Sequence, residues 1–263
     1  MIRMQSVLSA LMIVGLLVMT GCGTWFGTAA ADALVPVEQE VELGDQIAEE
    51  LAEELSFSDD EELTGYVVGL GEDLLEVVDR THEDLEFSFY LVDDDEMVNA
   101  FAIPGGGIYI FTGLIKAMDN EAELAAVMGH EIAHVTRRHI AQRLIAIYGV
   151  DAVANAALGE DPGLVGQLVR DVAQQGFMLS YSREQERDAD RFGVRYQSAA
   201  GYDPEGFITF FQKLEGAPTP PTFLSTHPPA GERIDNIRDH IDELESPGTR
   251  TEQERFEQMR DRI

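Results

Sequence analysis

Hydrophobic residues recur at helical spacing along most of this chain. The first such stretch covers residues 38–55, where apolar side chains stand three or four positions apart. The same period returns at 63–77 and 120–148, and further helices are expected at 112–118, from 182 onward, at 204–214 and up to 244. Residues 151–175, rich in Ala and Gly and broken at 161–163, are compatible with a mobile helical pair but do not determine one. A repeat near 3.6 residues predicts helices with one buried face, so helices should dominate the fold.

Two stretches predict strands, the first because polar and apolar residues alternate along it and the second because apolar residues flank a turn. One covers residues 87–92 and ends in a turn at 93–95. The other covers residues 98–111 and contains a Pro-Gly turn, so it should form two short strands. The expected fold class is therefore α+β, mainly α, with one small sheet.

Polar residues mark the starts of several predicted helices. Ser58 or Asp59 can cap the second helix. Asn120, followed by Glu123, forms a capping pattern for a helix that should run to Tyr148.

This longest predicted helix contains the motif His-Glu-x-x-His. His130 and His134 lie about 40° apart around the helix axis, so both imidazoles can reach one metal ion, and Glu131 can hold a water molecule. Zinc, one ion per chain, is the expected metal because it accepts nitrogen ligands and a catalytic zinc keeps one position open. The alternative is a helix with two ordinary histidines.

Two histidines do not complete a catalytic zinc site. The metzincin pattern requires Gly at position 137 and His at position 140, but this chain has Arg137 and Ile140. His139 lies about 140° around a continuous helix from His134 and is not expected to reach the same ion. The remaining option is a glutamate from a second helix.

The helix that begins at Ser182 offers such a glutamate. Ser182 and Gln185 form a capping-box pattern, and Glu186 and Asp190 stand four positions apart on one face. Glu186 can bind the metal, and Asp190 can accept the second ring N–H of a ligand histidine. The alternative is a charged, solvent-exposed helix, the usual meaning of such a run.

The predicted strand pair lies close in sequence to the zinc motif. A hydrophobic helix with His-Glu-x-x-His is typical of zinc peptidases, and an edge strand beside such a site can bind an extended peptide through main-chain hydrogen bonds. The candidate residues are Asn99, Ala100, Phe101 and Ala102. An ordinary hairpin in a small sheet explains the same pattern equally well.

Residues 1–21 have the layout of a signal peptide, with an apolar run at 7–19 that is too short for a comfortable membrane span. The only cysteine, Cys22, follows small residues as in a bacterial lipobox. We therefore expect cleavage before Cys22, lipid on its sulfur, and a spacer at 22–37. An incidental cysteine in an uncleaved anchor is the alternative. The body should lie lipid-anchored on the periplasmic side of the cell envelope, and Gly23 favours the outer membrane.

Acidic residues strongly outnumber basic ones, with 49 Asp and Glu against 18 Lys and Arg and a net charge of −31. Such a surface repels nucleic acid, so no nucleic-acid partner is expected. The acidic residues are spread along the chain, which favours adaptation to high salt over selection for basic substrates.

Several motifs together resemble a known family. They are Glu40 to Gly44, Asn99-Ala100-Phe101 with Pro104-Gly105-Gly106, His130-Glu131-x-x-His134, Ser182-Arg183-x-x-Glu186-x-x-Ala189-Asp190, and Thr226-His227-Pro228. The series resembles the HtpX/Ste-type zinc metallopeptidases (peptidase family M, number forty-eight), and within them the BepA/LoiP-like branch of periplasmic lipoproteins. The resemblance implies a zincin-like (gluzincin) metallopeptidase domain at 38–245, before a charged C-terminal tail at 246–263.

The resemblance also implies roles for individual residues. His130, His134 and Glu186 would bind zinc, and Glu131 would act as the general base. His227 would lie near the zinc.

Two roles remain open for His227. It either stabilises the oxyanion or fills the open position of the zinc as an inhibitory ligand. The alternative is that His227 is an ordinary turn residue without a role at the zinc. Arg233 would hold this loop or pair with the transition state.

The expected function is that of a zinc metalloendopeptidase, a hydrolase acting on proteins or peptides, which degrades misfolded or stalled cell-envelope proteins. The alternative is a gated or latent chaperone-like lipoprotein with a regulatory zinc site. A structural lipoprotein with coincidental histidines is a third interpretation. The lack of long hydrophobic spans after the leader disfavours a prenyl-peptide protease of the integral-membrane type.

Overall fold

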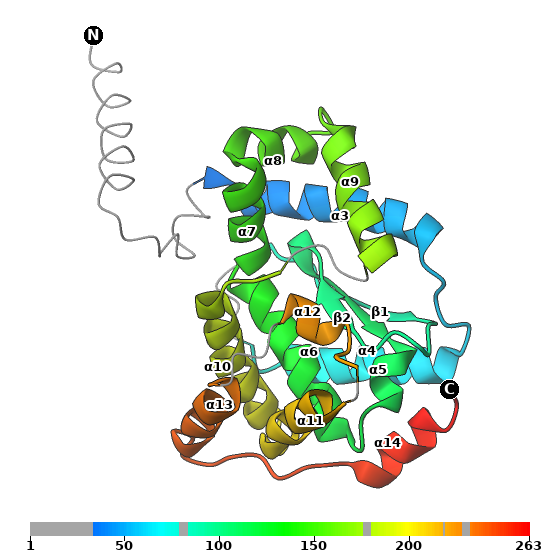
Figure 1. Ribbon diagram of the computed structural model, residues 1–263, viewed down its shortest axis with the longest axis vertical. Coiled ribbons are helices and arrows are strands. Elements are labelled where there is room, and N and C mark those ends of the chain that lie inside the picture. Colours follow the sequence, from blue (N-terminus) through cyan, green and yellow to red (C-terminus); the bar gives the residue numbers. More distant parts are fainter. Residues whose placement is uncertain (1–33, 79–83, 176–179, 218, 228–231) are drawn as a thin grey trace.

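The computed structural model describes residues 34–78, 84–175, 180–217, 219–227 and 232–263. Within these ranges helices surround one small sheet (Figure 1). The helices are α3 (Val37–Glu54), α4 (Glu61–Leu75), α5 (Thr112–Lys116), α6 (Glu121–Thr136), α7 (His139–Tyr148), α8 (Val150–Ala157), α9 (Pro162–Gln175), α10 (Arg183–Ala199), α11 (Glu205–Gly216), α12 (Phe223–Thr226), α13 (Arg233–Asp242) and α14 (Gln253–Arg260). None of these helices is long and apolar enough to cross a membrane.

The sheet has the strand order β1-β3-β2. β1 (Ser88–Val92) runs parallel to β3 (Gly107–Phe111), and β2 (Ala100–Ala102) pairs antiparallel with β3. The turn between β2 and β3 is the short 3-10 helix η1 (Pro104–Gly106), where Gly105 takes a φ of 80° that favours glycine. The predicted strands and their turn are confirmed, as is the mainly helical α+β class.

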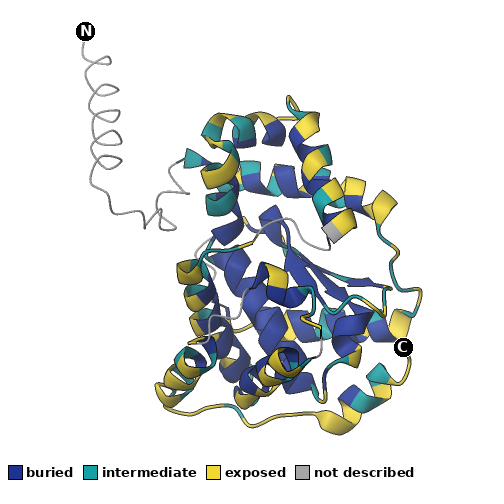
Figure 2. Cartoon of the chain, in the orientation of Figure 1, coloured by how far each residue is buried: buried dark blue, intermediate teal, exposed yellow. Residues whose placement is uncertain are grey.

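α6 is the central element of the molecule. Each of its residues is buried, and it lies inside the dark blue core of Figure 2. It packs on β2 and β3 as well as on α10 and α11. Its start is as predicted, because the Asn120 side chain accepts a hydrogen bond from the Glu123 N–H at 3.1 Å. A fully buried helix places any polar side chain it carries inside the protein.

The prediction of one helix from Asn120 to Tyr148 was wrong. α6 ends at Thr136, and α7 begins after Arg138, whose φ of 55° is left-handed. The buried Arg138 guanidinium explains the break, because it donates to the Glu40 carboxylate at 2.8 Å and to the backbone oxygen of Val35 at 2.7 Å. These partners outweigh the local helical preference of the sequence.

The predicted cap of α4 was displaced by one or two residues. Asp60, and neither Ser58 nor Asp59, accepts the N–H groups of Glu62 and Leu63 at 3.0 Å. The Ser58 hydroxyl accepts the N–H of Asp60 instead. The helix therefore starts slightly later than expected.

Helices α7, α8 and α9 gather with α3 at the upper end of the molecule in Figure 1. α3 packs on both α8 and α9, the two helices that the structure shows in a stretch whose organisation the sequence left open. On its other side α3 packs on η1, where Gly44 permits close approach, since a Cβ there would lie 2.1 Å from the Pro104 oxygen.

A pair of glycines brings α6 and α10 together. A Cβ on Gly129 would lie 3.2 Å from the Gly193 oxygen, and one on Gly193 would lie 3.1 Å from the backbone of His130. The start of α10 is as predicted, with Ser182 and Gln185 forming a complete capping box. Close packing of these helices sets the position of every side chain that α10 directs toward α6.

The C-terminal segment 246–263 packs against the domain. Phe256 of α14 is fully buried, the Thr251 oxygen accepts the N–H of Glu121 at 3.0 Å, and Arg260 donates to the Met118 oxygen at 2.9 Å. The segment expected to be a charged tail thus contacts the start of α6.

Candidate metal centre

The two histidines of α6 point to one place, as their spacing predicted. His130 and His134 are both fully buried, and their Nε2 atoms lie 3.0 Å apart. The rings meet nearly edge to face, with 4.7 Å between centroids. Two buried imidazole nitrogens directed at one point are the start of a metal site.

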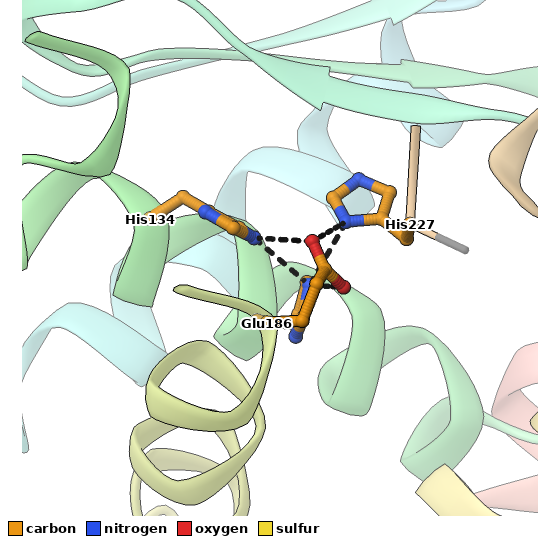
Figure 3. A group of neighbouring side chains, drawn as sticks. His134, Glu186 and His227 are labelled. Atoms are coloured by element: carbon orange, nitrogen blue, oxygen red, sulfur yellow. Dashed lines mark hydrogen bonds and ion pairs between the residues drawn. The ribbon is translucent and has the colours of Figure 1, made fainter. Parts of the chain in front are cut away.

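Glu186 reaches the same point from the first turn of α10. Its carboxylate oxygens lie 3.6 Å from His134 Nε2 and 3.7 Å from His130 Nε2. Figure 3 shows the carboxylate directed between the rings of His134 and His227. The charged run at 182–190 is therefore no simple solvent-exposed helix, because Glu186 is buried.

His227 completes the group from the end of α12. Its Nδ1 lies 3.1 Å from His130 Nε2 and 3.0 Å from a Glu186 oxygen. The ring is held by stacking on Phe223, with centroids 4.6 Å apart. His227 is buried, so it is a member of the polar cluster.

The spacing of His130, His134, Glu186 and His227, which we call the candidate metal group, fits a metal ion. One nitrogen or oxygen from each lies within 4.8 Å of all the others. Ligand atoms around a tetrahedral zinc at about 2.0–2.2 Å lie about 3.3–3.6 Å apart, and the separations between His130, His134, Glu186 and His227 bracket that value. Three imidazoles and one carboxylate form a donor set that zinc accepts readily.

Glu131 stands beside this group. One carboxylate oxygen lies 3.2 Å from His227 Nε2, and the other has no hydrogen-bond partner among the described residues although it is buried. A buried carboxylate oxygen without a partner is costly. It is free to accept a proton from a water molecule or substrate group that enters the site.

Asp190 and Arg233 support the group from behind. Asp190 lies 3.1 Å from Nδ1 of His130, the place expected for it from the sequence. Arg233 donates to Asp190 at 2.8 Å and lies 2.7 Å from Glu186. It also donates to the backbone oxygen of His227 at 3.3 Å, so one buried guanidinium links α10, α13 and the His227 segment.

The electrostatics of the group favour a bound cation. Burial lowers the pKa of His134 well below its usual 6.5, which keeps the ring neutral as a metal ligand must be. Burial raises the pKa of Glu186, but His227 and Arg233 outweigh it and hold that pKa well below 4.5. Burial lowers the pKa of His227, but the carboxylates of Glu186 and Glu131 raise it to about 9. Two buried carboxylates thus attract positive charge at this position.

Sequence reasoning missed three residues around the site. His139 stays outside the group of four, as expected, but its Nδ1 lies 3.2 Å from Nδ1 of His134. Its Nε2 lies 3.3 Å from Asp188. The Tyr181 ring stacks on His134, with centroids 3.7 Å apart. Asp188 and Tyr181 carried no sequence signal, and the inward position of His139 follows from a helix break that was not predicted.

The proposed substrate strand occupies an edge of the sheet but is covered. Asn99, Ala100, Phe101 and Ala102 are all buried. Next to them, the Val98 oxygen accepts the N–H of Phe223 at 3.1 Å, so α12 lies against this strand. Its role in substrate binding stays a prediction. Cys22, the signal peptide and Pro228 lie outside the described residues.

Comparison with known proteins identifies the family of this chain. Residues 61–241 match the model of Peptidase family M48. The chain is 34% identical over 244 residues to the Beta-barrel assembly-enhancing protease of Yersinia pestis, covering 87% of this chain and 49% of the relative. It is 33% identical over 232 residues to the Escherichia coli (strain K12) protein of the same name, covering 83% and 47%. It is 31% identical over 166 residues to the Mitochondrial metalloendopeptidase OMA1 of Schizosaccharomyces pombe, covering 62% and 49%.

The chain spans about half the length of these curated relatives. The family model covers most of the chain and includes all four residues of the candidate metal centre. This protein belongs to peptidase family M48.

Proposed function

We propose that the protein is a zinc-dependent metalloendopeptidase, with one zinc held by His130, His134 and Glu186. The observation that carries this proposal is the buried group on α6 and α10, with the partner-free oxygen of Glu131 beside it. Zinc at such a site lowers the pKa of a bound water and polarises a peptide carbonyl. Protein and peptide bonds are the substrates that fit this chemistry.

The residues of the chain then divide the work. Glu131 takes a proton from the attacking water and delivers it to the leaving amine. Asp190 orients His130 through the ring nitrogen that faces away from the group. Arg233 holds Glu186 in place through a contact of 2.7 Å.

The substitution Glu131→Gln tests this proposal. It should leave about one zinc per chain and reduce casein cleavage at least about 10²-fold, the usual contribution of a general base. Glu184→Gln is the matched control, because Glu184 is exposed on the helix that carries Glu186. Full activity in Glu131→Gln, or a wild-type chain without zinc, would refute the proposal.

A gated form of the same enzyme is the second candidate. His227 lies within the candidate metal group, and its segment also contacts the chain just before β2, where the Phe223 N–H donates to the Val98 oxygen. In this second candidate, one short segment fills both the open metal position and the place where an extended substrate would bind. These contacts support the interpretation of His227 as an inhibitory ligand.

Replacement of His227 by Ala separates the two roles of this residue. If His227 blocks the site, casein cleavage by His227→Ala should rise above wild type at unchanged zinc content. If it stabilises the transition state, cleavage should fall. Unchanged activity would contradict both roles.

We further propose that the chain is lipid-anchored through Cys22 on the periplasmic side of the cell envelope, preferably at the outer membrane, where it degrades misfolded or stalled envelope proteins. The lipobox-like sequence supports the anchor, and similarity to relatives named for enhancing β-barrel assembly supports the client class. Cys22→Ser should move the protein from the membrane to the soluble fraction and abolish incorporation of radiolabelled fatty acid. Membrane retention of that variant would argue for another anchor.

A further inference from the structure

His139 lies directly behind one of the candidate metal ligands. Its Nδ1 is 3.2 Å from Nδ1 of His134, on the side of that ring that faces away from the metal group. Its other ring nitrogen is 3.3 Å from the Asp188 carboxylate. His139 is buried and Asp188 is partly buried. The three side chains form a line that ends at the metal group.

This inference rests on the proposed function, in which His134 binds a metal ion. The hydrogen bonds among His134, His139 and Asp188 then allow only one placement of the imidazole protons. If Nε2 of His134 binds the metal, its proton must be on Nδ1, which then needs an acceptor. His139 Nδ1 is within reach to accept it, so His139 must carry its own proton on Nε2. That proton is donated to Asp188. A histidine protonated on both nitrogens could not accept from His134.

We propose that His139 and Asp188 are positioning residues, which fix the tautomer and the ring orientation of His134. His139 passes the effect of the Asp188 carboxylate on to a ligand that this carboxylate does not itself reach. Neither residue belongs to the group of four and both act through His134, so neither is a catalytic residue. Loss of a group that orients a metal ligand in this way typically costs about 10- to 100-fold in metal affinity or activity.

Two features of the fold bring His139 and Asp188 into this position. The left-handed Arg138 ends α6 and turns α7, so that His139 faces His134 although a continuous helix would separate them by about 140°. Asp188 is held from the other side by Arg137, at 2.7 Å. α10 thereby supplies one candidate ligand and a carboxylate for each ligand histidine, Asp190 directly and Asp188 through His139.

Two substitutions of His139 distinguish positioning from simple packing. His139→Phe keeps a planar ring of similar size but removes the acceptor for His134. His139→Asn loses the ring but places a carbonyl oxygen near the position of Nδ1, where it can still accept. A packing role predicts that Phe is the better replacement, whereas the positioning role predicts that Asn is better.

The zinc dissociation constant, measured by competition with a chromogenic chelator, is the main readout. We expect His139→Phe to bind zinc about 10- to 100-fold more weakly than wild type, as other losses of such support do, and His139→Asn to lose less than that. Equal losses in both variants, a larger loss in Asn, or no loss in Phe would each overturn the proposal. His240→Asn is the matched control, since His240 lies on α13 and outside the metal group.

A second measurement uses the wild-type chain and does not depend on the variants folding. In the zinc-loaded protein, ¹⁵N–¹H spectra of the imidazoles should show His134 protonated on Nδ1 and His139 protonated on Nε2. A proton on Nδ1 of His139 would overturn the inference while leaving the proposed peptidase intact. A wild-type chain that binds no zinc would overturn the proposed function and this inference with it.

Discussion

The close packing of α3 on η1 makes Gly44 a sensitive position. Gly44 lies in the middle of α3, where helix propensity alone predicts that Gly44→Ala stabilises the protein by about 0.5–1 kcal/mol. The structure predicts the opposite. A Cβ at this position would lie 2.1 Å from the backbone oxygen of Pro104 and 2.9 Å from its carbonyl carbon, and neither backbone atom can rotate away.

The size of the effect follows from this overlap. An overpacked contact typically costs about 1–3 kcal/mol, and here the upper part of that range applies because backbone meets backbone. After the gain in helix propensity, Gly44→Ala should destabilise the fold by about 2 kcal/mol. For a domain of this size that corresponds to a fall in Tm of about 4–8 °C.

The matched control is Gly65→Ala on α4. Gly65 is exposed, and a Cβ there would meet nothing within 4 Å, so this variant should gain about 0.5–1 kcal/mol. Both substitutions change the unfolded chain in the same way, so the difference between them isolates the clash with η1. Urea and thermal unfolding of the two variants provide the comparison. A Gly44→Ala chain as stable as Gly65→Ala would refute this account of the packing.

Three further predictions concern the tail, the surface charge and the metal. Phe256→Ala should lower the free energy of unfolding by about 3–5 kcal/mol because the side chain is fully buried. The control Gln258→Ala, at an exposed position of the same helix, should change it by less than about 0.5 kcal/mol. Equal urea midpoints for the two variants would show that α14 contributes nothing to the fold. The urea midpoint of the wild type should rise from low to molar NaCl, because salt screens the repulsion within a chain of net charge −31. An unchanged or falling midpoint would remove the case for adaptation to high salt. Removal of zinc with a chelator should lower the free energy of unfolding by about 2.7 kcal/mol relative to the protein with zinc at a hundredfold excess over its Kd. The Tm should return to its original value when zinc is added back. An unchanged Tm would argue against the metal centre.

The sequence alone determined the features that depend on near neighbours. The helical period, the caps at Asn120 and Ser182, and the Pro-Gly turn all follow from residues within a few positions of one another, and the structure shows each of them. The spacing within His-Glu-x-x-His predicted that His130 and His134 converge, since a helix fixes the relation between positions four apart.

Tertiary structure decided what depends on distant partners. The break after α6 needs the buried contact between Arg138 and Glu40, which are 98 positions apart, and without that partner the local pattern favours one continuous helix. The inward turn of His139 is a consequence of the break, so it could not be foreseen.

The position of His227 depends even more on the assembled fold. His227 and His130 are separated by 97 positions, yet their ring nitrogens lie 3.1 Å apart. This contact exists because Gly129 and Gly193 let α6 and α10 pack closely and because Arg233 ties Glu186 to the His227 segment. A sequence motif specifies ligand types and local spacing, whereas the packing of helices against one another determines which distant side chains complete the site.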